Sequence, residues 1–391
     1  MSCYVVYAQR TAIGSFMGTL KTIEAHKLGS HLIKDLLAKN IIAPELISQV
    51  LIGQVLTAGC GQNPARQTSI GGGISNQIPC TTINKVCGSG LNAILLGSCM
   101  IQAGYANCVI AGGQENMSLS PHSINLRSGI RMNSATMLDT MITDGLTDAF
   151  NNYHMGVTAE NIAKKYSITR EQQDQFAYAS QIKASKAQIS GNFNNEIVPL
   201  QIQSKKDTII FDKDEFIKHD TTLDNISKLQ ARFIPMDGAV TPGNSSGIND
   251  GAALTLIMDE ATLKECNAQP IARIVSYATT GVDPAIMGIG PVAAVNNALG
   301  KAGWKINDLD LIELNEAFAA QSLAVLAELG ADQTKVNIHG GAIALGHPIG
   351  ASGARIVVTL LHAMRANKKK RGLAALCIGG GMGIAMCFEL Y

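Results

Sequence analysis

Cys87 is the residue whose surroundings most clearly suggest nucleophilic chemistry. It lies in residues 84–90 (Asn-Lys-Val-Cys-Gly-Ser-Gly), after an extended pattern and before an apolar stretch typical of a helix. A cysteine at a helix N-terminus meets unpaired backbone N–H groups and the positive end of the helix dipole, which favour the thiolate. An unreactive buried cysteine before a glycine turn fits the same pattern, so the sequence leaves both interpretations open.

His347 is a candidate acid or base. It lies within the glycine-rich residues 340–353, and Pro348 directly after it disfavours helical geometry at the histidine. So few large side chains surround it that the imidazole is expected to stay accessible. This setting favours a functional histidine over one that only fills the core.

Cys377 and Asn315 each follow an apolar, strand-like pattern. Cys377 precedes the glycines of residues 379–383, whose backbone N–H groups could face a negatively charged oxygen. Taken alone, that pattern favours a small buried residue before a tight turn. Asn315 is either the N-cap of a helix over 316–329, with Glu316 in its first turn, or an amide that orients a water molecule.

Short β-branched segments alternate with helical patterns along the chain, which predicts layers of helices on a sheet. The expected strands are 50–53, 108–111, 309–314 and 336–338, and the expected helices are 90–102, 316–329 and 352–366. A weak repeat also relates the two ends. Residues 6–8 resemble 276–278, 50–52 resemble 311–313, 88–94 resemble 351–356, and 109–113 resemble 377–380. The repeat predicts two similar α/β halves.

The region between the halves has a different composition, with Met-rich and charged stretches and a polar helix candidate at 158–190. We expect residues 118–247 to form an inserted loop domain that covers the core. The N-terminal half then comprises residues 1–117 plus 248–266, and the C-terminal half comprises residues 267–391.

Composition excludes several classes of protein. Hydrophobic residues make up 46% of the 391 residues and charged residues only 16%, which predicts a globular core. A net charge of +1 argues against binding to nucleic acid or an anionic membrane. Residues 86–114 lack charge, but glycine and asparagine interrupt them, so a buried helix and strand are expected rather than a membrane span.

Nine cysteines without a CxxC pair, and an N-terminus that begins like a strand, predict a reduced cytoplasmic setting. Motifs for a metal, a phosphate loop or a dinucleotide are missing from the sequence. We therefore expect no metal site.

Taken together, the segments 84–90, 315–318, 346–350 and 377–383 resemble the thiolase family, in order and over the whole chain. The resemblance implies a thiolase-like α/β fold. In that fold, two similar βαβαβαββ halves form a layered core, and a loop domain is inserted in the first half. This agrees with the repeat and the insertion.

The resemblance also implies roles for the reactive residues. Cys87 would take an acyl group from acyl-CoA as a thioester, aided by His347, and Cys377 would remove a proton from the methyl group of a second acetyl-CoA. His347 and a water held by Asn315 would stabilise the enolate oxygen. The backbone N–H groups of Cys87 and Gly379 would stabilise the tetrahedral oxyanion.

Residues 154–156 (His-Met-Gly) are similar to the short-chain members of the family, in which the methionine narrows the acyl pocket. Lys218 stands where the family commonly has Arg, and Pro242 where it commonly has Ala. The substrate and CoA contacts implied by the resemblance are Leu146, His154, Met155, Lys218, Phe233, Gly243, Ser246, Ala317 and Phe318.

The implied activity is acetyl-CoA C-acetyltransferase, which condenses two acetyl-CoA to acetoacetyl-CoA and CoA and also runs in reverse. It needs no cofactor beyond the CoA that the substrate carries. The resemblance further implies a homotetramer built as a dimer of dimers. The alternatives are a degradative 3-ketoacyl-CoA thiolase of broader chain length and a non-catalytic acyl-CoA-binding relative. A decarboxylating ketoacyl synthase is disfavoured by Cys377.

Overall fold

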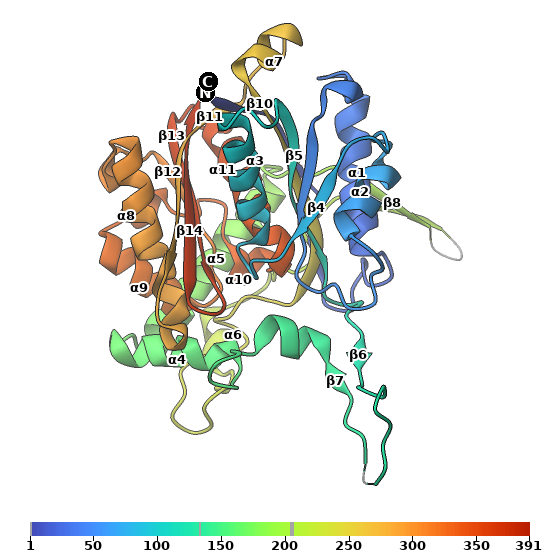
Figure 1. Cartoon of the computed structure of the whole chain (residues 1–391). Helices are drawn as coiled ribbons and strands as arrows, with labels where there is room; N and C mark the ends of the chain where they lie inside the picture. Colours follow the sequence, from blue (N-terminus) through green and yellow to red (C-terminus); the bar gives the residue numbers. More distant parts are fainter. Residues whose placement is uncertain (1, 133, 204–206) are drawn as a thin grey trace.

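One mixed β-sheet runs through the whole molecule. The structure is a computed structural model that describes residues 2–132, 134–203 and 207–391. The strand order is β12–β13–β14–β11–β1–β10–β5–β3–β4, with β2 (Gly14–Ser15) paired to β10 (Figure 1). The other strands are β1 (Cys3–Arg10), β3 (Gln49–Gly53), β4 (Cys80–Ile83), β5 (Cys108–Asn116), β10 (Asn249–Asp259), β11 (Ala272–Gly281), β12 (Leu311–Leu314), β13 (Arg371–Ile378) and β14 (Met382–Leu390).

The two ends of the chain build similar halves of this sheet. Neighbouring strands β1, β10, β5 and β3 in one half correspond to β11, β14, β13 and β12 in the other. The halves join through a short antiparallel pairing of β1 with β11, in which Cys3 faces Ile274. This strand order confirms the predicted layered α/β fold of two similar halves.

Helices cover both faces of the sheet. Helices α1 (Ala25–Ala38) and α2 (Pro64–Gly72) flank one half, and α8 (Gly290–Ala302) and α9 (Ala319–Leu329) flank the other (Figure 1). Helices α3 (Ser89–Gln102) and α11 (Ile349–Ala366) pack against each other in the centre. A Cβ atom at Gly90 would lie 2.8 Å from the backbone nitrogen of Ala354, so only glycine permits this close approach.

Three predicted elements differ in the structure. The helix expected over 158–190 is two helices, α4 (Met155–Lys165) and α5 (Arg170–Ile189). Ser167 has a positive φ of 53° between them, and Thr169 starts α5 with a capping box. The strand expected at 336–338 is a single parallel bridge from Val336 to Ile312. The helix expected from residue 316 begins at Ala319.

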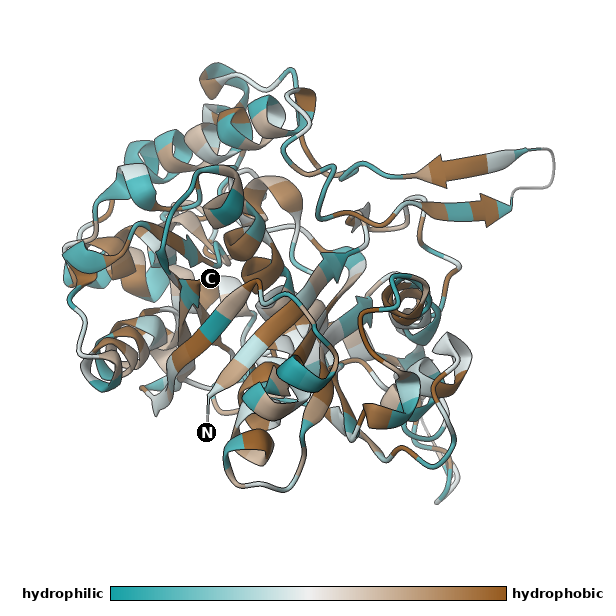
Figure 2. Ribbon diagram, turned by 90° about the horizontal axis from the view of Figure 1, so that it is seen from above, coloured by the Kyte–Doolittle hydropathy of each residue, from teal (hydrophilic) through white to brown (hydrophobic). Residues whose placement is uncertain are grey.

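The segment between β5 and β10 extends from the body as two hairpins and folds back as helices. Its elements are β6 (His122–Ser123), β7 (Leu138–Asp139), a π-helical turn (Met141–Leu146), α4, α5, β8 (Leu200–Gln203), β9 (Thr208–Phe211) and α6 (Leu223–Ser227). Figure 2 shows the β8–β9 hairpin projecting away from the sheet, with apolar residues along it.

Buried Arg10 of β1 ties this segment to the core. Its Nε donates to Glu196 Oε1 at 2.6 Å, and its Nη1 and Nη2 donate to the two carboxylate oxygens of Asp214 at 2.7 and 2.9 Å. All three side chains are buried. The segment is therefore held by ionic hydrogen bonds as well as by apolar packing.

Candidate active site

A largely apolar cavity of about 360 Å³ opens where α3 and α11 begin. Its lining includes Cys87, His347 and Gly379, which come from three separate parts of the chain. Apolar side chains such as Met155 and Phe318 form much of the remaining wall. The fold thus brings two of the three predicted reactive side chains to one cavity.

A strained turn presents Cys87 to this cavity. Val86 has a φ of 46°, a left-handed conformation that a β-branched residue rarely adopts. Its N–H donates to Asn84 Oδ1 at 3.0 Å, and its carbonyl accepts from Ser89 Oγ at 2.7 Å. Ser89 Oγ in turn accepts from the N–H of Lys85 at 2.8 Å. These bonds hold the strained turn in place, which is typical of functional sites.

The surroundings of Cys87 act on the pKa of its thiol in opposite directions. Burial raises the pKa of its thiol to about 11, although the backbone N–H groups of Gly379 and of Cys87 itself lower it in part. Helix α3 begins at Ser89, with Gly88 as its N-cap. The loss of solvation outweighs the helix N-terminus, which favours the thiol over the thiolate in the resting protein. A base must take the proton when the sulfur reacts.

His347 meets the requirements for that base. Its backbone N–H donates to Asn249 Oδ1 at 2.9 Å. Its Nδ1 lies 2.6 Å from Ser352 Oγ, and that hydroxyl donates to the carbonyl of Pro348 at 2.9 Å. A hydroxyl has one hydrogen and a carbonyl only accepts, so we assign the hydrogen of the other bond to Nδ1.

The opposite ring nitrogen of His347 is then an acceptor. Nε2 is buried and has no hydrogen-bond partner within the described parts of the chain. Burial, and secondarily the positive charge of Arg355, lower the pKa of His347 to about 3. The imidazole is neutral at physiological pH, and its free lone pair can accept a proton.

Cys377 lies behind the cavity wall rather than in its lining. It is the penultimate residue of β13, is buried, and packs in a cluster with Met155, Met287 and Phe318. Burial is the main cause that raises the pKa of its thiol, followed by the charge that Cys87 would carry. Met155 and Phe318 of this cluster also line the cavity that contains Cys87.

Asn315 is not the N-cap of the following helix. The N-cap of α9 is Phe318, three residues later, and the backbone N–H of Asn315 instead donates to the carbonyl of Ala375 at 3.0 Å. Both side-chain polar atoms of Asn315 are buried, and neither has a partner in the described residues. Buried amides are normally paired, so this one is available to hold a water or a substrate oxygen.

Most of the predicted substrate contacts line the cavity. His154 stacks on Phe233 with ring centroids 4.7 Å apart, and Phe233 meets Phe318 edge to face at 6.4 Å. These rings form an apolar wall suited to a slender chain. The predicted contacts in the lining are Leu146, His154, Met155, Phe233, Ser246, Ala317 and Phe318. Lys218 and Gly243 lie elsewhere, in a neighbouring pocket of about 280 Å³ that shares Phe216 and Pro242 with the cavity.

Two supporting residues of the site, Ser352 and Glu115, were not among the predicted ones. Ser352 follows His347 by five residues, at the start of α11. This short spacing could have indicated a hydrogen bond between the two side chains. Glu115 had no signal. It is buried, it accepts backbone N–H groups of Val55, Leu56 and Gly350 at 3.0, 3.2 and 2.9 Å, and burial raises its pKa to about 7.

Two absences hold within the described residues. No group of three or more His, Cys, Asp or Glu side chains there could hold a metal ion. No described helix is both long and apolar enough to cross a lipid bilayer.

Comparisons with known proteins match the whole chain. Residues 3–261 match the family model "Thiolase, N-terminal domain" and residues 268–390 match "Thiolase, C-terminal domain". The acetyl-CoA acetyltransferase of Chromobacterium violaceum is 57% identical, with all of both chains covered. The "Acetyl-CoA acetyltransferase, cytosolic" of Mus musculus is 51% identical, over 98% of this chain and 97% of that one.

Two solved structures have nearly the same fold. The Bacillus anthracis acetyl-CoA acetyltransferase has a TM-score of 0.97 at 40% identity, over 100% of this chain and 99% of that one. Human mitochondrial 3-ketoacyl-CoA thiolase has a TM-score of 0.96 at 40% identity, over 100% and 98%. Because their names differ in substrate while their scores agree, the overall fold does not separate the two substrate classes.

Proposed function

This chain belongs to the thiolase family, and on that premise we propose that it is an acetyl-CoA C-acetyltransferase, an acyltransferase that condenses two acetyl-CoA to acetoacetyl-CoA and CoA and also runs in reverse. The observation that carries the mechanism is a buried His347 Nε2, without a hydrogen-bond partner among the described residues, at the cavity that also exposes Cys87. Burial lowers the pKa of His347, which favours a neutral imidazole. Full-length identity to acetyl-CoA acetyltransferases supports the substrate.

In the first half-reaction, the Cys87 sulfur attacks the thioester carbonyl while His347 Nε2 takes the thiol proton. The backbone N–H groups of Cys87 and Gly379 stabilise the negative oxygen of the tetrahedral intermediate. The bond to the CoA sulfur breaks, and the CoA thiolate takes the proton of Cys377. This leaves acetyl-Cys87, protonated His347 and a Cys377 thiolate.

In the second half-reaction, Cys377 acts as the base. A thiolate whose conjugate acid has a raised pKa is a strong base, which suits proton removal from the methyl group of acetyl-CoA. Protonated His347 and a water held by Asn315 stabilise the enolate oxygen. The carbanion attacks acetyl-Cys87, and the leaving Cys87 sulfur recovers its proton from His347. All three groups return to their starting protonation states.

The cavity supports a preference for short acyl groups. The sulfur of Met155 lies 3.5 Å from where a Cβ of Gly379 would be, which places this side chain directly beside one of the oxyanion donors. We propose that the pantetheine arm passes between the His154–Phe233 stack and Ser246, and that Lys218 and Gly243 lie nearer the rest of CoA. Residues 118–247 would then cover the bound CoA.

We also propose the assembly and location that the family suggests. The hairpin formed by β6 and β7 carries exposed apolar side chains, including Leu126, Ile130 and Met137. These side chains support contacts between copies in a homotetramer. A relative named as cytosolic supports a cytoplasmic location.

Labelling tests the covalent step. The protein is incubated with radiolabelled acetyl-CoA, digested and mapped, and the label is expected on the peptide that contains Cys87. Label on Cys60 or Cys99, or only on CoA, contradicts the mechanism. The Cys377→Ser variant separates the two half-reactions, because it should still acquire label at Cys87 yet exchange the acetyl methyl protons with solvent more slowly. Unchanged exchange removes Cys377 from the role of base.

A thiolysis series tests the substrate class. Acetoacetyl-CoA is expected to be cleaved best, with kcat/KM falling as the acyl chain lengthens. A flat series would instead favour the degradative 3-ketoacyl-CoA thiolase. Tight binding of acyl-CoA with neither label nor thiolysis would identify a non-catalytic relative.

A further inference from the structure

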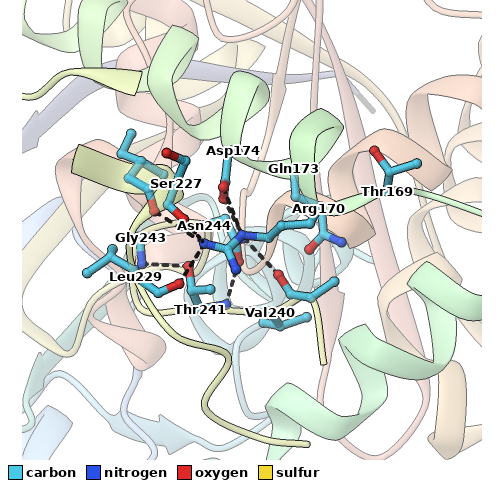
Figure 3. Close-up of polar contacts among 12 residues, drawn as sticks. Thr169, Arg170, Gln173, Asp174, Ser227, Leu229, Val240, Thr241, Gly243 and Asn244 are labelled. Carbon is cyan, nitrogen blue, oxygen red and sulfur yellow. Dashed lines mark hydrogen bonds and ion pairs between the residues drawn. The ribbon is translucent and has the colours of Figure 1, made fainter. Parts of the chain in front are cut away.

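A chain of polar contacts starts at partly exposed Arg170, the first residue of α5, and continues through buried side chains (Figure 3). The Nη2 group of Arg170 donates to the carbonyls of Ile226 at 3.3 Å, Ser227 at 3.2 Å and Leu229 at 2.7 Å. These carbonyls belong to the end of the short helix α6 and the turn after it. The Arg170 guanidinium therefore holds in place the start of the loop that runs from α6 to Phe233.

Arg170 is connected to the far end of that loop through Asp174. Its Nε donates to Asp174 Oδ2 at 2.8 Å, and Asp174 Oδ1 accepts from Asn244 Nδ2 at 2.9 Å. Asp174 is 2% exposed and Asn244 is fully buried. Both carboxylate oxygens thus have a protein donor, which a buried charge requires.

Asn244 makes three further hydrogen bonds to backbone groups. Its Nδ2 also donates to the carbonyl of Ala239 at 3.0 Å, and its Oδ1 accepts from the N–H of Thr241 at 2.8 Å. Its main-chain carbonyl accepts from the N–H of Ala319 at 2.9 Å. Ala319 is the first residue of α9 and directly follows the segment 315–318.

The segments that these hydrogen bonds hold in place form one wall of the cavity. Phe233 and Pro242 line it from the loop, and Ala317 and Phe318 line it from the turn before α9. The N–H of Ser246 donates to the carbonyl of Ala317 at 3.0 Å, which joins the two segments. The polar chain therefore sets how the loop and the turn lie relative to each other.

We propose that Arg170 and Asp174 are positioning residues for the CoA substrates, and this rests on the proposed acetyltransferase function. Neither side chain lines the cavity. They act through Asn244, which holds the Phe233 loop against the Ala317–Phe318 turn at the width that the pantetheine arm requires. Because they adjust the binding wall rather than Cys87 or His347, their loss should weaken CoA binding more than it slows chemistry.

The Asp174→Asn variant tests this with almost no change in shape. An amide offers one acceptor where two are needed, so its NH2 group must face either the Arg170 or the Asn244 donor. We expect KM for acetyl-CoA in condensation, and for CoA in thiolysis, to rise about ten-fold, with kcat changed less than about two-fold. The matched control is Glu171→Gln, which removes one charge from an exposed position on the same helix and should leave KM unchanged.

Chemical rescue separates positioning from general stability. In Arg170→Ala, methylguanidinium at a non-denaturing concentration should lower the raised KM toward the wild-type value, because the Arg170 site borders a pocket at the surface. Arg273→Ala, which loses a partly exposed pair with Glu389, should show neither a raised KM nor a response to methylguanidinium. A merely structural defect would not be reversed in this way.

The outcomes distinguish the two proposals. A folded wild-type protein without acetyl transfer overturns the proposed function. An active wild type with unchanged KM in Asp174→Asn overturns the positioning role. So does a raised KM in Arg170→Ala that methylguanidinium does not lower.

Discussion

Ser352→Ala is the substitution that most directly tests how His347 is prepared as a base. Ser352 Oγ lies 2.6 Å from His347 Nδ1 and is buried, so water cannot readily replace it. Without the hydroxyl, the Nδ1 hydrogen has no acceptor, and the ring can carry its hydrogen on Nε2 instead. A ring protonated at Nε2 cannot accept the Cys87 proton.

The size of the effect follows from the buried bond. Leaving a buried donor unsatisfied costs about 1–3 kcal/mol, which corresponds to roughly a 5- to 150-fold loss in rate. We therefore expect acetylation of Cys87 to slow about 10- to 100-fold. The KM for acetyl-CoA should change little, because Ser352 is not among the lining residues of the cavity.

A rapid-mixing measurement of CoA release in the first turnover reports this step directly. Thr359→Val is the matched control, since its buried hydroxyl lies further along the same helix and donates to Glu196 Oε1 at 3.0 Å. The control should lose stability but acetylate at the wild-type rate. Wild-type acetylation in Ser352→Ala, or equal slowing in both variants, would refute the argument from the tautomer.

Three further predictions concern the thiol, the acyl pocket and the buried ion pairs. Because burial raises the pKa of Cys87 to about 11, its thiolate fraction grows with pH, and alkylation by iodoacetamide should speed up about ten-fold per pH unit through the neutral range; a plateau below pH ~8 contradicts the raised pKa. Met155→Ala should raise kcat/KM for 3-ketohexanoyl-CoA relative to acetoacetyl-CoA by about ten-fold in thiolysis, and an unchanged ratio would show that Met155 does not limit chain length. Asp214→Asn should lower the free energy of unfolding in urea by about 3–5 kcal/mol, because it breaks the buried pair with Arg10. Asp224→Asn, which breaks an exposed pair with Lys228, should lower the free energy of unfolding by under about 1 kcal/mol in the same assay. Similar losses in Asp214→Asn and Asp224→Asn would contradict this reasoning.

The predicted fold came from local patterns that survive in the folded protein. Strand β13 and residues 108–111 of β5 are buried along most of their length, so they appear in the sequence as nearly unbroken apolar runs. The paired motifs at Gly90 and Gly353 reflect the contact of α3 with α11. Both features leave a direct trace in residue type.

The wrong predictions involve places where distant residues decide the local structure. Asn315 resembles an N-cap in sequence. In the structure its backbone N–H bonds to the carbonyl of Ala375 in β13, so the chain stays extended there and α9 begins only at Ala319. The break between α4 and α5 requires a positive φ at Ser167, and serine is not a residue type that predicts a positive φ. The position of Lys218 and Gly243 in a neighbouring pocket also depends on how the inserted segment folds, and their contact with CoA stays a prediction.

The amino-acid sequence by itself determined the alternation of strands and helices, the repeat of two halves and the turns that carry Cys87 and His347. Each depends on residues close together in the chain. Only the tertiary structure decided the features that favour a thiol at Cys87, a neutral imidazole at His347 and a hydrogen on its Nδ1. Those states depend on burial, and burial here is produced by segments such as β13 and the start of α11, which are far from Cys87 in the chain and meet it only after folding.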